Sequence, residues 1–328
     1  MKKQNLMMGG LAAAVAFGLM GAAADQVRAE YPEKRIEMLI GFAAGGGTDL
    51  VSRRIAEGME RELGQTVTPI NKPGAGGLIA LQEAAAAAPD GYTLSSFVAN
   101  NSLIQKHFEE IVNFVDPLDE LTILGMVNAD YWAIAVPSDA PYDTIPEFIE
   151  YLEENPGAKV SDGGPGSAYH WGWRTFEDTT GVSVETVTYG GTAAALSALA
   201  GRELTASSTA VPEAASLVDA GLIKVLGVAA PERYENFPDV ATFSEQGIEM
   251  VYGPTRGIAG PAGLSDEVVQ TLSDAIRVAF ESDEYQKFLS DSGYSGFYLD
   301  HEDATAFVAS EEERLMGLME RAGVLRQP

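Results

Sequence analysis

Short apolar runs alternate with segments of helical spacing along most of the chain. The apolar runs have the length of buried strands and lie at residues 36–40, 67–70, 92–98, 121–127, 131–136, 159–161, 182–188, 204–207 and 222–228. Between them, apolar residues recur at helical spacing, as Leu50, Ile55 and Met59 do after the first run. The alternation predicts an α/β protein with parallel sheets, whose ligands bind at the carboxyl ends of the strands.

The end of the chain has a different pattern. From Ser265 onward it predicts helix after helix, with Val268, Leu272 and Ile276 on one face of the first. The 328 residues are enough for two domains, and 46% of them are apolar, so substantial cores can form. No long Gly/Ser linker interrupts the chain, so we expect extended strands to join two such domains.

The first residues have the pattern of a secretory signal. Lys2 and Lys3 precede an Ala-rich apolar run at 6–24, and Val27-Arg28-Ala29 fits the small-x-small pattern of a signal peptidase site. We expect residues 1–29 to be a signal peptide that is cut after Ala29. A membrane anchor is the alternative, because the run is near spanning length but rich in Ala and Gly.

Cysteine is absent, which excludes disulfides, thiolate metal ligands and the lipid-attachment cysteine of a bacterial lipoprotein.

The formal net charge is −27, and removing a signal that carries Lys2, Lys3, Asp25 and Arg28 takes it to −29. So acidic a surface argues against nucleic acid and anionic membranes as partners. The acidic residues are spread along the whole chain, which we interpret as adaptation to high salt.

A glycine-rich stretch at residues 42–49, Phe-Ala-Ala-Gly-Gly-Gly-Thr-Asp, lies between the first strand and its helix. Three consecutive glycines let backbone N–H groups converge on a ligand, and the helix start adds a partial positive charge. The stretch is therefore predicted to bind an anion. A plain strand-to-helix turn, with Thr48 or Asp49 as N-cap, is the alternative.

Two later turns share this character. Asp162-Gly163-Gly164-Pro165-Gly166-Ser167 and Tyr189-Gly190-Gly191-Thr192 each lie between a strand and a helix. Three such turns indicate a cleft with backbone donors on both walls. Asn101, after another strand, either offers a side-chain donor to the ligand or caps a helix.

Several kinds of enzyme site are missing from the sequence. Gly41 and Gly46 have P-loop spacing, but Gly47 stands where the phosphate-binding lysine belongs. Nucleophile-elbow and H-E-x-x-H motifs are absent, and the three histidines are far apart. Ser167 and His170 could form a nucleophile and base, but a helix cap and a packed histidine fit them better. We therefore expect no catalysis, no metal and no cofactor.

Arg256 is the one charged residue of the segment Gly253-Pro254-Thr255-Arg256-Gly257-Ile258. Among apolar and small neighbours, a guanidinium either meets a ligand carboxylate or pairs with an internal acid. The sequence leaves both roles open.

Together these motifs resemble the periplasmic substrate-binding proteins of tripartite tricarboxylate transporters, the TctC or Bug family. The resemblance covers the chain from Tyr31 onward. It rests on the turn at 42–49, Asn71-Lys72-Pro73-Gly74-Ala75-Gly76-Gly77, Pro89-Asp90-Gly91-Tyr92, Gly164-Pro165-Gly166-Ser167 with His170, Tyr189 with Gly191, Arg233, Pro238-Asp239-Val240 and Pro261-Ala262-Gly263.

The resemblance implies a two-lobed, type II periplasmic binding protein fold, with a central sheet in each lobe and a helical C-terminal tail. We expect lobe 1 at 30–130 and 251–328, and lobe 2 at 131–250. The lobes would close on a small carboxylate, which could be a di- or tricarboxylate or another organic acid. Its expected contacts are Phe42, Ala43, Ala44, Gly45, Gly46, Thr48, Asp49, Asn101, Gly164, Gly166, Ser167, Tyr189, Gly191, Thr192 and Arg256.

The implied role is that of a periplasmic, monomeric receptor that delivers its ligand to the membrane permease subunits of the transporter. A sensory partner that presents the ligand to a membrane kinase, or an α/β enzyme, are the alternatives. The chain departs from many members in having Asp162-Gly163 directly before Gly164-Pro165-Gly166-Ser167, Gly190 where a lysine is common, and Thr255 in place of a tryptophan. The first two changes add an acid and remove a cation, and Arg256 could supply the missing charge.

The acidic composition makes one prediction about stability. The melting temperature should rise with added salt, because at about 1 M salt the Debye length falls to roughly 3 Å and self-repulsion is screened. Circular dichroism melts across a salt series test this expectation. A melting temperature that does not rise would contradict the high-salt interpretation.

Overall fold

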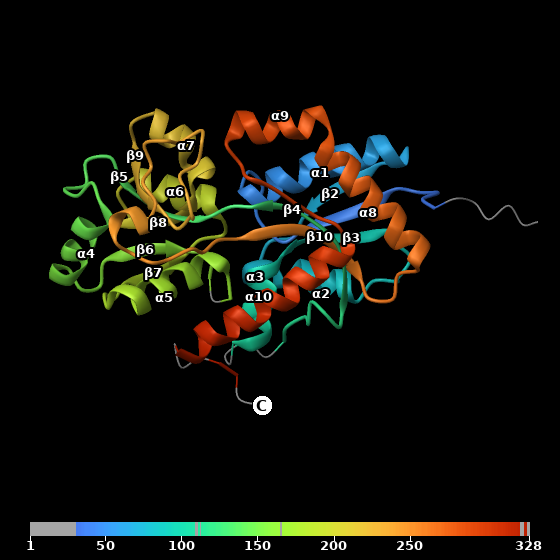
Figure 1. Cartoon of the computed structure of the whole chain (residues 1–328), viewed down its shortest axis with the longest axis horizontal. Helices are drawn as coiled ribbons and strands as arrows, with labels where there is room; N and C mark the ends of the chain where they lie inside the picture. The colour runs from blue at the N-terminus through green and yellow to red at the C-terminus, as the bar shows by residue number, and fades with distance from the viewer. Residues whose placement is uncertain (1–30, 109–110, 112, 165, 322–324, 327–328) are drawn as a thin grey trace, which may run out of the picture. The chain divides into compact units, whose positions relative to one another are not determined.

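The computed structural model describes residues 31–108, 111, 113–164, 166–321, 325 and 326. The predicted signal peptide at 1–29 and Pro165 of the second turn lie outside these residues. The described chain forms two mixed β-sheets flanked by helices (Figure 1). Within this part of the chain, no helix combines the length and hydropathy that a membrane span requires.

The larger sheet has six strands in the order β11-β4-β10-β3-β1-β2. These strands are β1 (Ile36–Ile40), β2 (Val67–Asn71), β3 (Thr93–Val98), β4 (Leu121–Ala129), β10 (Thr255–Pro261) and β11 (Gly296–Leu299). The helices that accompany it in the chain are α1 (Gly47–Leu63), η1 (Ala75–Gly77), α2 (Leu78–Ala85), α3 (Ala99–His107), α8 (Asp266–Glu281), α9 (Asp283–Ser292) and α10 (His301–Arg321).

The second sheet has five strands in the order β7-β6-β8-β5-β9. They are β5 (Trp132–Pro137), β6 (Lys159–Asp162), β7 (Glu185–Thr188), β8 (Ala206–Ala210) and β9 (Ile223–Val228). Its helices are α4 (Ile145–Glu154), α5 (Ala168–Thr180), α6 (Thr192–Ala200), α7 (Val211–Asp219) and η2 (Ser244–Gln246).

The α/β class is confirmed, but the expectation of parallel sheets is wrong in part. β1 is parallel to β2 and β3, and β6 is parallel to β7 and β8. In contrast, β10 runs antiparallel to β3 and β4, and β5 runs antiparallel to β8 and β9. Apolar runs show where strands lie and do not show their direction. β5 follows β4 of the other sheet directly, and β10 follows β9 of the other sheet through a segment that contains only the short helix η2. Neither strand is therefore preceded by the α-helical crossover that joins parallel neighbours.

The helical tail is also interrupted. The sequence pattern predicts helices throughout, whereas β11 forms an edge strand against β4 between α9 and α10. α8 does form as expected, with Leu272 and Ile276 buried, and it packs against α1. The two helices approach closely at Gly58 of α1, where an added Cβ would lie only 2.4 Å from the Cβ of Ala279.

Extended chain joins the two sheets, as expected. Only Asp130 and Tyr131 separate β4 of the larger sheet from β5 of the second. β10 brings the chain back into the larger sheet, with Arg256 opposite Asn128 of β4. The junction between the sheets therefore carries Asp130 and Arg256 side by side.

Candidate functional site

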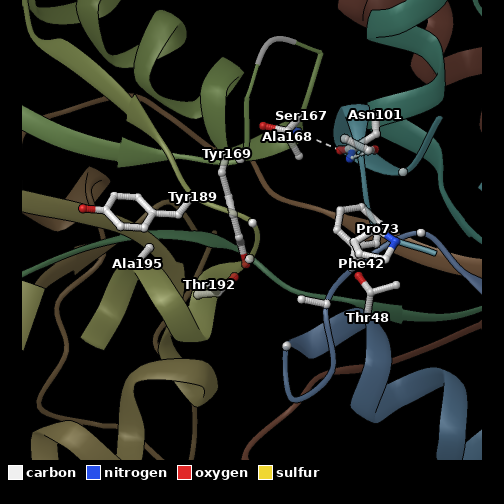
Figure 2. A pocket seen from close by; sticks show the side chains of 18 of the residues that line it. Phe42, Thr48, Pro73, Asn101, Ser167, Ala168, Tyr169, Tyr189, Thr192 and Ala195 are labelled. Carbon is white, nitrogen blue, oxygen red and sulfur yellow. Dashed lines mark hydrogen bonds between the residues drawn. The ribbon is translucent and has the colours of Figure 1, made fainter. Parts of the chain in front are cut away.

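A cavity of about 550 Å³ lies among turns that follow strands of both sheets. Figure 2 shows Phe42 and Thr48 on one side of it and Tyr189 and Thr192 on the other, with Tyr169 between them in this view. Phe42 and Thr48 belong to the turn after β1, whereas Tyr189 and Thr192 belong to the turn after β7. Turns from the two sheets thus face each other, as the three glycine-rich motifs lead one to expect.

Ten of the residues selected from the sequence line this cavity. They are Phe42, Ala43, Gly46, Thr48, Asn101, Ser167, Tyr189, Gly191, Thr192 and Arg256. The lining does not include the other five, which are Ala44, Gly45, Asp49, Gly164 and Gly166.

Some backbone donors of the turn after β1 are already bonded to acceptors of the protein. The Gly45 N–H donates to Asp49 Oδ2 at 2.9 Å, and the Gly47 N–H donates to Glu213 Oε1 at 3.1 Å. Asp49 also accepts from Arg53 and Asn71, so its carboxylate braces the turn. Neither Thr48 nor Asp49 is the N-cap of α1, since Gly46 holds that place without a side-chain bond.

Other backbone donors of these turns are free. Among the described residues, no acceptor is found for the N–H groups of Gly46 and Thr48 on one wall, or of Gly191 and Thr192 on the other. These four residues all line the cavity. Gly46 and Thr48 stand at the start of α1, and Gly191 and Thr192 at the start of α6, where the helix dipole favours negative charge.

The turn after β6 is held by a buried acid. Asp162 Oδ2 lies 2.6 Å from His170 Nδ1, and its Oδ1 accepts from the Gly164 N–H and the Thr188 hydroxyl. Burial alone would raise the pKa of Asp162, but these hydrogen bonds outweigh it and lower the pKa. Ser167 Oγ accepts from the backbone N–H of His170 and caps α5. The helix-cap interpretation of Ser167 is therefore confirmed.

Asn101 ties the two walls together. Its Oδ1 accepts from the Ala168 N–H at 2.7 Å, and its Nδ2 donates to the Gly76 carbonyl at 2.8 Å. Gly76 belongs to the Asn71–Gly77 motif of the larger sheet, and Ala168 begins α5 of the second. The Asn101 amide thus links the sheets at the rim of the cavity.

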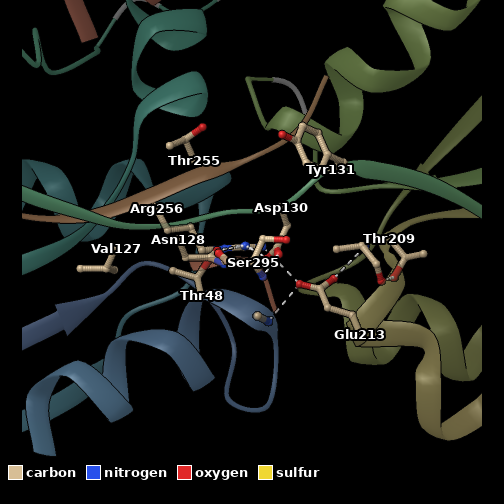
Figure 3. Close-up of polar contacts among 12 residues, drawn as sticks. Thr48, Val127, Asn128, Asp130, Tyr131, Thr209, Glu213, Thr255, Arg256 and Ser295 are labelled. Atoms are coloured by element: carbon tan, nitrogen blue, oxygen red, sulfur yellow. Dashed lines mark hydrogen bonds and ion pairs between the residues drawn. The ribbon is translucent and has the colours of Figure 1, made fainter. Parts of the chain in front are cut away.

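Arg256 pairs with internal acids, which is one of the two roles left open by the sequence. It is only 3% exposed and donates to Asp130, to Glu213 Oε1 at 3.3 Å and to Asn128 Oδ1 at 2.5 Å (Figure 3). Burial disfavours its charge, but the carboxylates of Asp130 and Glu213 prevail and raise the pKa of Arg256. The guanidinium therefore stays charged while its side chain also lines the cavity.

Sequence reasoning missed Glu213 and Tyr169. Glu213 lies in the first turn of α7, and its Oε2 accepts from the Tyr169 hydroxyl at 2.8 Å. Its Oε1 reaches across to Gly47 and Arg256, which belong to elements of the larger sheet. An acid in the first turn of a helix is commonplace, so no local pattern marks Glu213. We call Arg256, Asp130, Glu213 and Tyr169 the arginine cluster.

The Asp162 carboxylate makes a testable contribution to stability. Asp162→Asn should lower the free energy of unfolding by about 1–3 kcal/mol near neutral pH, because charge-assisted bonds to His170, Gly164 and Thr188 are weakened. A carboxyl with a lowered folded pKa stabilises the fold above its unfolded pKa of about 4, and this stabilisation is lost at lower pH. The deficit should therefore shrink at about pH 3.

Urea unfolding at the two pH values measures this effect. Asp178→Asn is the matched control, because Asp178 is an exposed acid on the same helix, α5. If Asp162→Asn does not lower the free energy of unfolding at neutral pH, or lowers it equally at about pH 3, this role of Asp162 is contradicted.

Comparison with known proteins agrees with the fold. The family model of the tripartite tricarboxylate transporter family receptor, TctC, matches residues 51–324. A Cupriavidus necator protein named "UPF0065 protein in gbd 5'region" is 30% identical over 328 residues, and the match covers 99% of each chain.

Solved structures show the same likeness. The periplasmic binding protein BugD matches with a TM-score of 0.84 at 28% identity, over 90% of this chain and 100% of BugD. MatC from Rhodopseudomonas palustris with bound malate matches with a TM-score of 0.81 at 26% identity, over 88% of this chain and 99% of MatC. The family resemblance drawn from the motifs and the periplasmic binding protein fold are thus confirmed, and the chain belongs to the TctC family of solute-binding receptors.

Proposed function

We propose that this protein is a periplasmic receptor that captures a small carboxylate and delivers it to the membrane permease of a tripartite tricarboxylate transporter. The observation that carries the proposal is the set of free backbone donors on both walls of the cavity, at Gly46, Thr48, Gly191 and Thr192. Malate bound to the similar protein MatC supports a carboxylate as ligand. We further propose that the chain acts without catalysis and as a monomer.

The free donors suit a carboxylate for physical reasons. Each carboxylate oxygen accepts two hydrogen bonds, and bonds to an ionised acceptor are stronger than bonds between neutral groups. Two helix starts add favourable partial charge without a desolvated lysine. Ligand carboxylate held between Gly46 and Thr192 would join the two walls, directly or through ordered water.

Closure of two lobes would follow from this arrangement. We assign residues 30–130 and 251–328 to one lobe and 131–250 to the other. A ligand that contacts both lobes binds best when they are together, so it shifts the population toward the closed form. The permease would then recognise the closed form, while the predicted signal peptide at 1–29 would direct the protein to the periplasm.

Calorimetry with mono-, di- and tricarboxylates tests the proposal, with Gly46→Val as the diagnostic variant. Gly46 has a φ of −83°, and a Cβ there would meet only the Ala43 carbonyl oxygen, at 3.7 Å. The valine should therefore fold, yet its methyl groups should cover the free donors of the turn. We expect at least about a tenfold loss of carboxylate affinity, the equivalent of one charge-assisted hydrogen bond.

Gly201→Val is the matched control, because Gly201 has a φ of −76°, meets only ordinary contacts and lies outside the cavity lining. It should leave the affinity unchanged. Binding of a sugar or nucleotide and of no carboxylate would overturn the proposed function. Undiminished carboxylate binding by a folded Gly46→Val protein would remove this turn from the site.

A further inference from the structure

Among the described residues, the lining of the cavity has three charged side chains, namely Asp162, Glu213 and Arg256. Two are acids and one is a base. Asp162 is engaged with His170, Gly164 and Thr188. Within the described part of the lining, Arg256 is therefore the one cation that could meet a ligand.

The charge of Arg256 is already paired with carboxyl groups of the protein. Its guanidinium pairs with Asp130 and with Glu213, and its Nε donates to the Thr48 hydroxyl at 3.2 Å. The side chains of Asp130, Glu213 and Arg256 are 0%, 5% and 4% exposed, so water screens these charges little. Burial raises the pKa of Asp130 despite its pairing with Arg256, so Glu213 is the carboxylate that this guanidinium meets within the cavity lining.

Glu213 lies where a ligand carboxylate would be expected to bind. Its Oε1 accepts from the Gly47 N–H at the start of α1 and from Arg256, which are the groups that an anion would seek. A Cβ on Gly47 would lie 2.2 Å from Glu213 Oε1 and 2.9 Å from Arg256 Nη2. A side chain at position 47 would thus displace the Glu213 carboxylate, which is the protein's own carboxylate at this anion site.

The rest of the lining is largely apolar. Phe42, Pro73, Val98, Tyr189, Ala194 and Ala195 all contribute to it. Contact between these side chains and an apolar ligand body is favourable, and none of them carries a charge that could pair with a second carboxylate.

We infer that the cavity selects a monocarboxylate with an apolar body over a di- or tricarboxylate, and that Glu213 is the residue that sets this preference. The inference rests on the proposed function. The single carboxylate is held by the free backbone donors of the two walls. A second carboxylate would lose its water, meet no unpaired cation among the described lining residues and be repelled by Glu213.

Calorimetry with matched acids tests this inference on the mature protein. The probes are butanoate against butanedioate, hexanoate against hexanedioate, and benzoate against 1,4-benzenedicarboxylate. For the probe pairs whose monoacid binds most tightly, the wild-type protein should bind the monoacid at least about tenfold more tightly than its diacid. This is a difference of about 1.4 kcal/mol in binding free energy. Glu213→Gln removes the negative charge in nearly the same shape and leaves Arg256 paired with Asp130 alone, so it should reduce this ratio at least about tenfold.

Asp219→Asn is the matched control, because Asp219 is an exposed acid on the same helix, α7, outside the cavity lining. It should leave the ratio unchanged, which separates a local effect of Glu213 from the general effect of net charge. Melting curves establish that each variant is folded. If Glu213→Gln does not fold, the ratio of monoacid to diacid affinity of the wild-type protein tests the inference.

The outcomes are distinct. Diacids that bind wild-type protein more tightly than monoacids, or a ratio that a folded Glu213→Gln protein leaves unchanged, would overturn the inference while the proposed carboxylate receptor stands. Failure of every acid to bind either protein would overturn both.

Discussion

The buried guanidinium of Arg256 is the interaction on which the junction of the two sheets depends. It joins β10, the end of β4 and the start of α7 through Asp130 and Glu213, and it touches α1 through Thr48. A buried charge is costly unless it is paired and hydrogen-bonded, and removing one partner typically costs about 3–5 kcal/mol. The arginine cluster therefore fixes how the turns of both sheets face the cavity, and it does so at one wall of the cavity itself.

The same cluster is the reason why we propose that backbone groups, and not Arg256, bind the anion. Arg256 is held by carboxylates of the protein, and Glu213 covers the Gly47 N–H. What remains for a ligand are the N–H groups at Gly46, Thr48, Gly191 and Thr192, which carry partial charges and are fixed by the starts of two helices. Such donors hold one carboxylate well and leave the choice of ligand to the shape and charge of the remaining lining.

Much of the fold could be predicted from the sequence, because strand and helix periodicities are local properties. The runs at 36–40, 67–70 and 92–98 became β1, β2 and β3, and glycine-rich turns followed strands in both sheets. The directions of β5 and β10 could not be predicted, since they depend on the path by which the chain passes between sheets. β11 was missed because Gly296–Leu299 is short and gains its strand form only by pairing with β4. Glu213 was missed for a related reason, since 166 residues separate it from Gly47.

The most direct test of this account is a crystal structure of the protein with a bound monocarboxylate. We predict that the ligand carboxylate lies against the N–H groups of Gly46 or Thr48 and of Gly191 or Thr192, directly or through water, while Glu213 remains on Arg256 and Gly47. A ligand carboxylate paired with Arg256, with Glu213 displaced from it, would contradict the account.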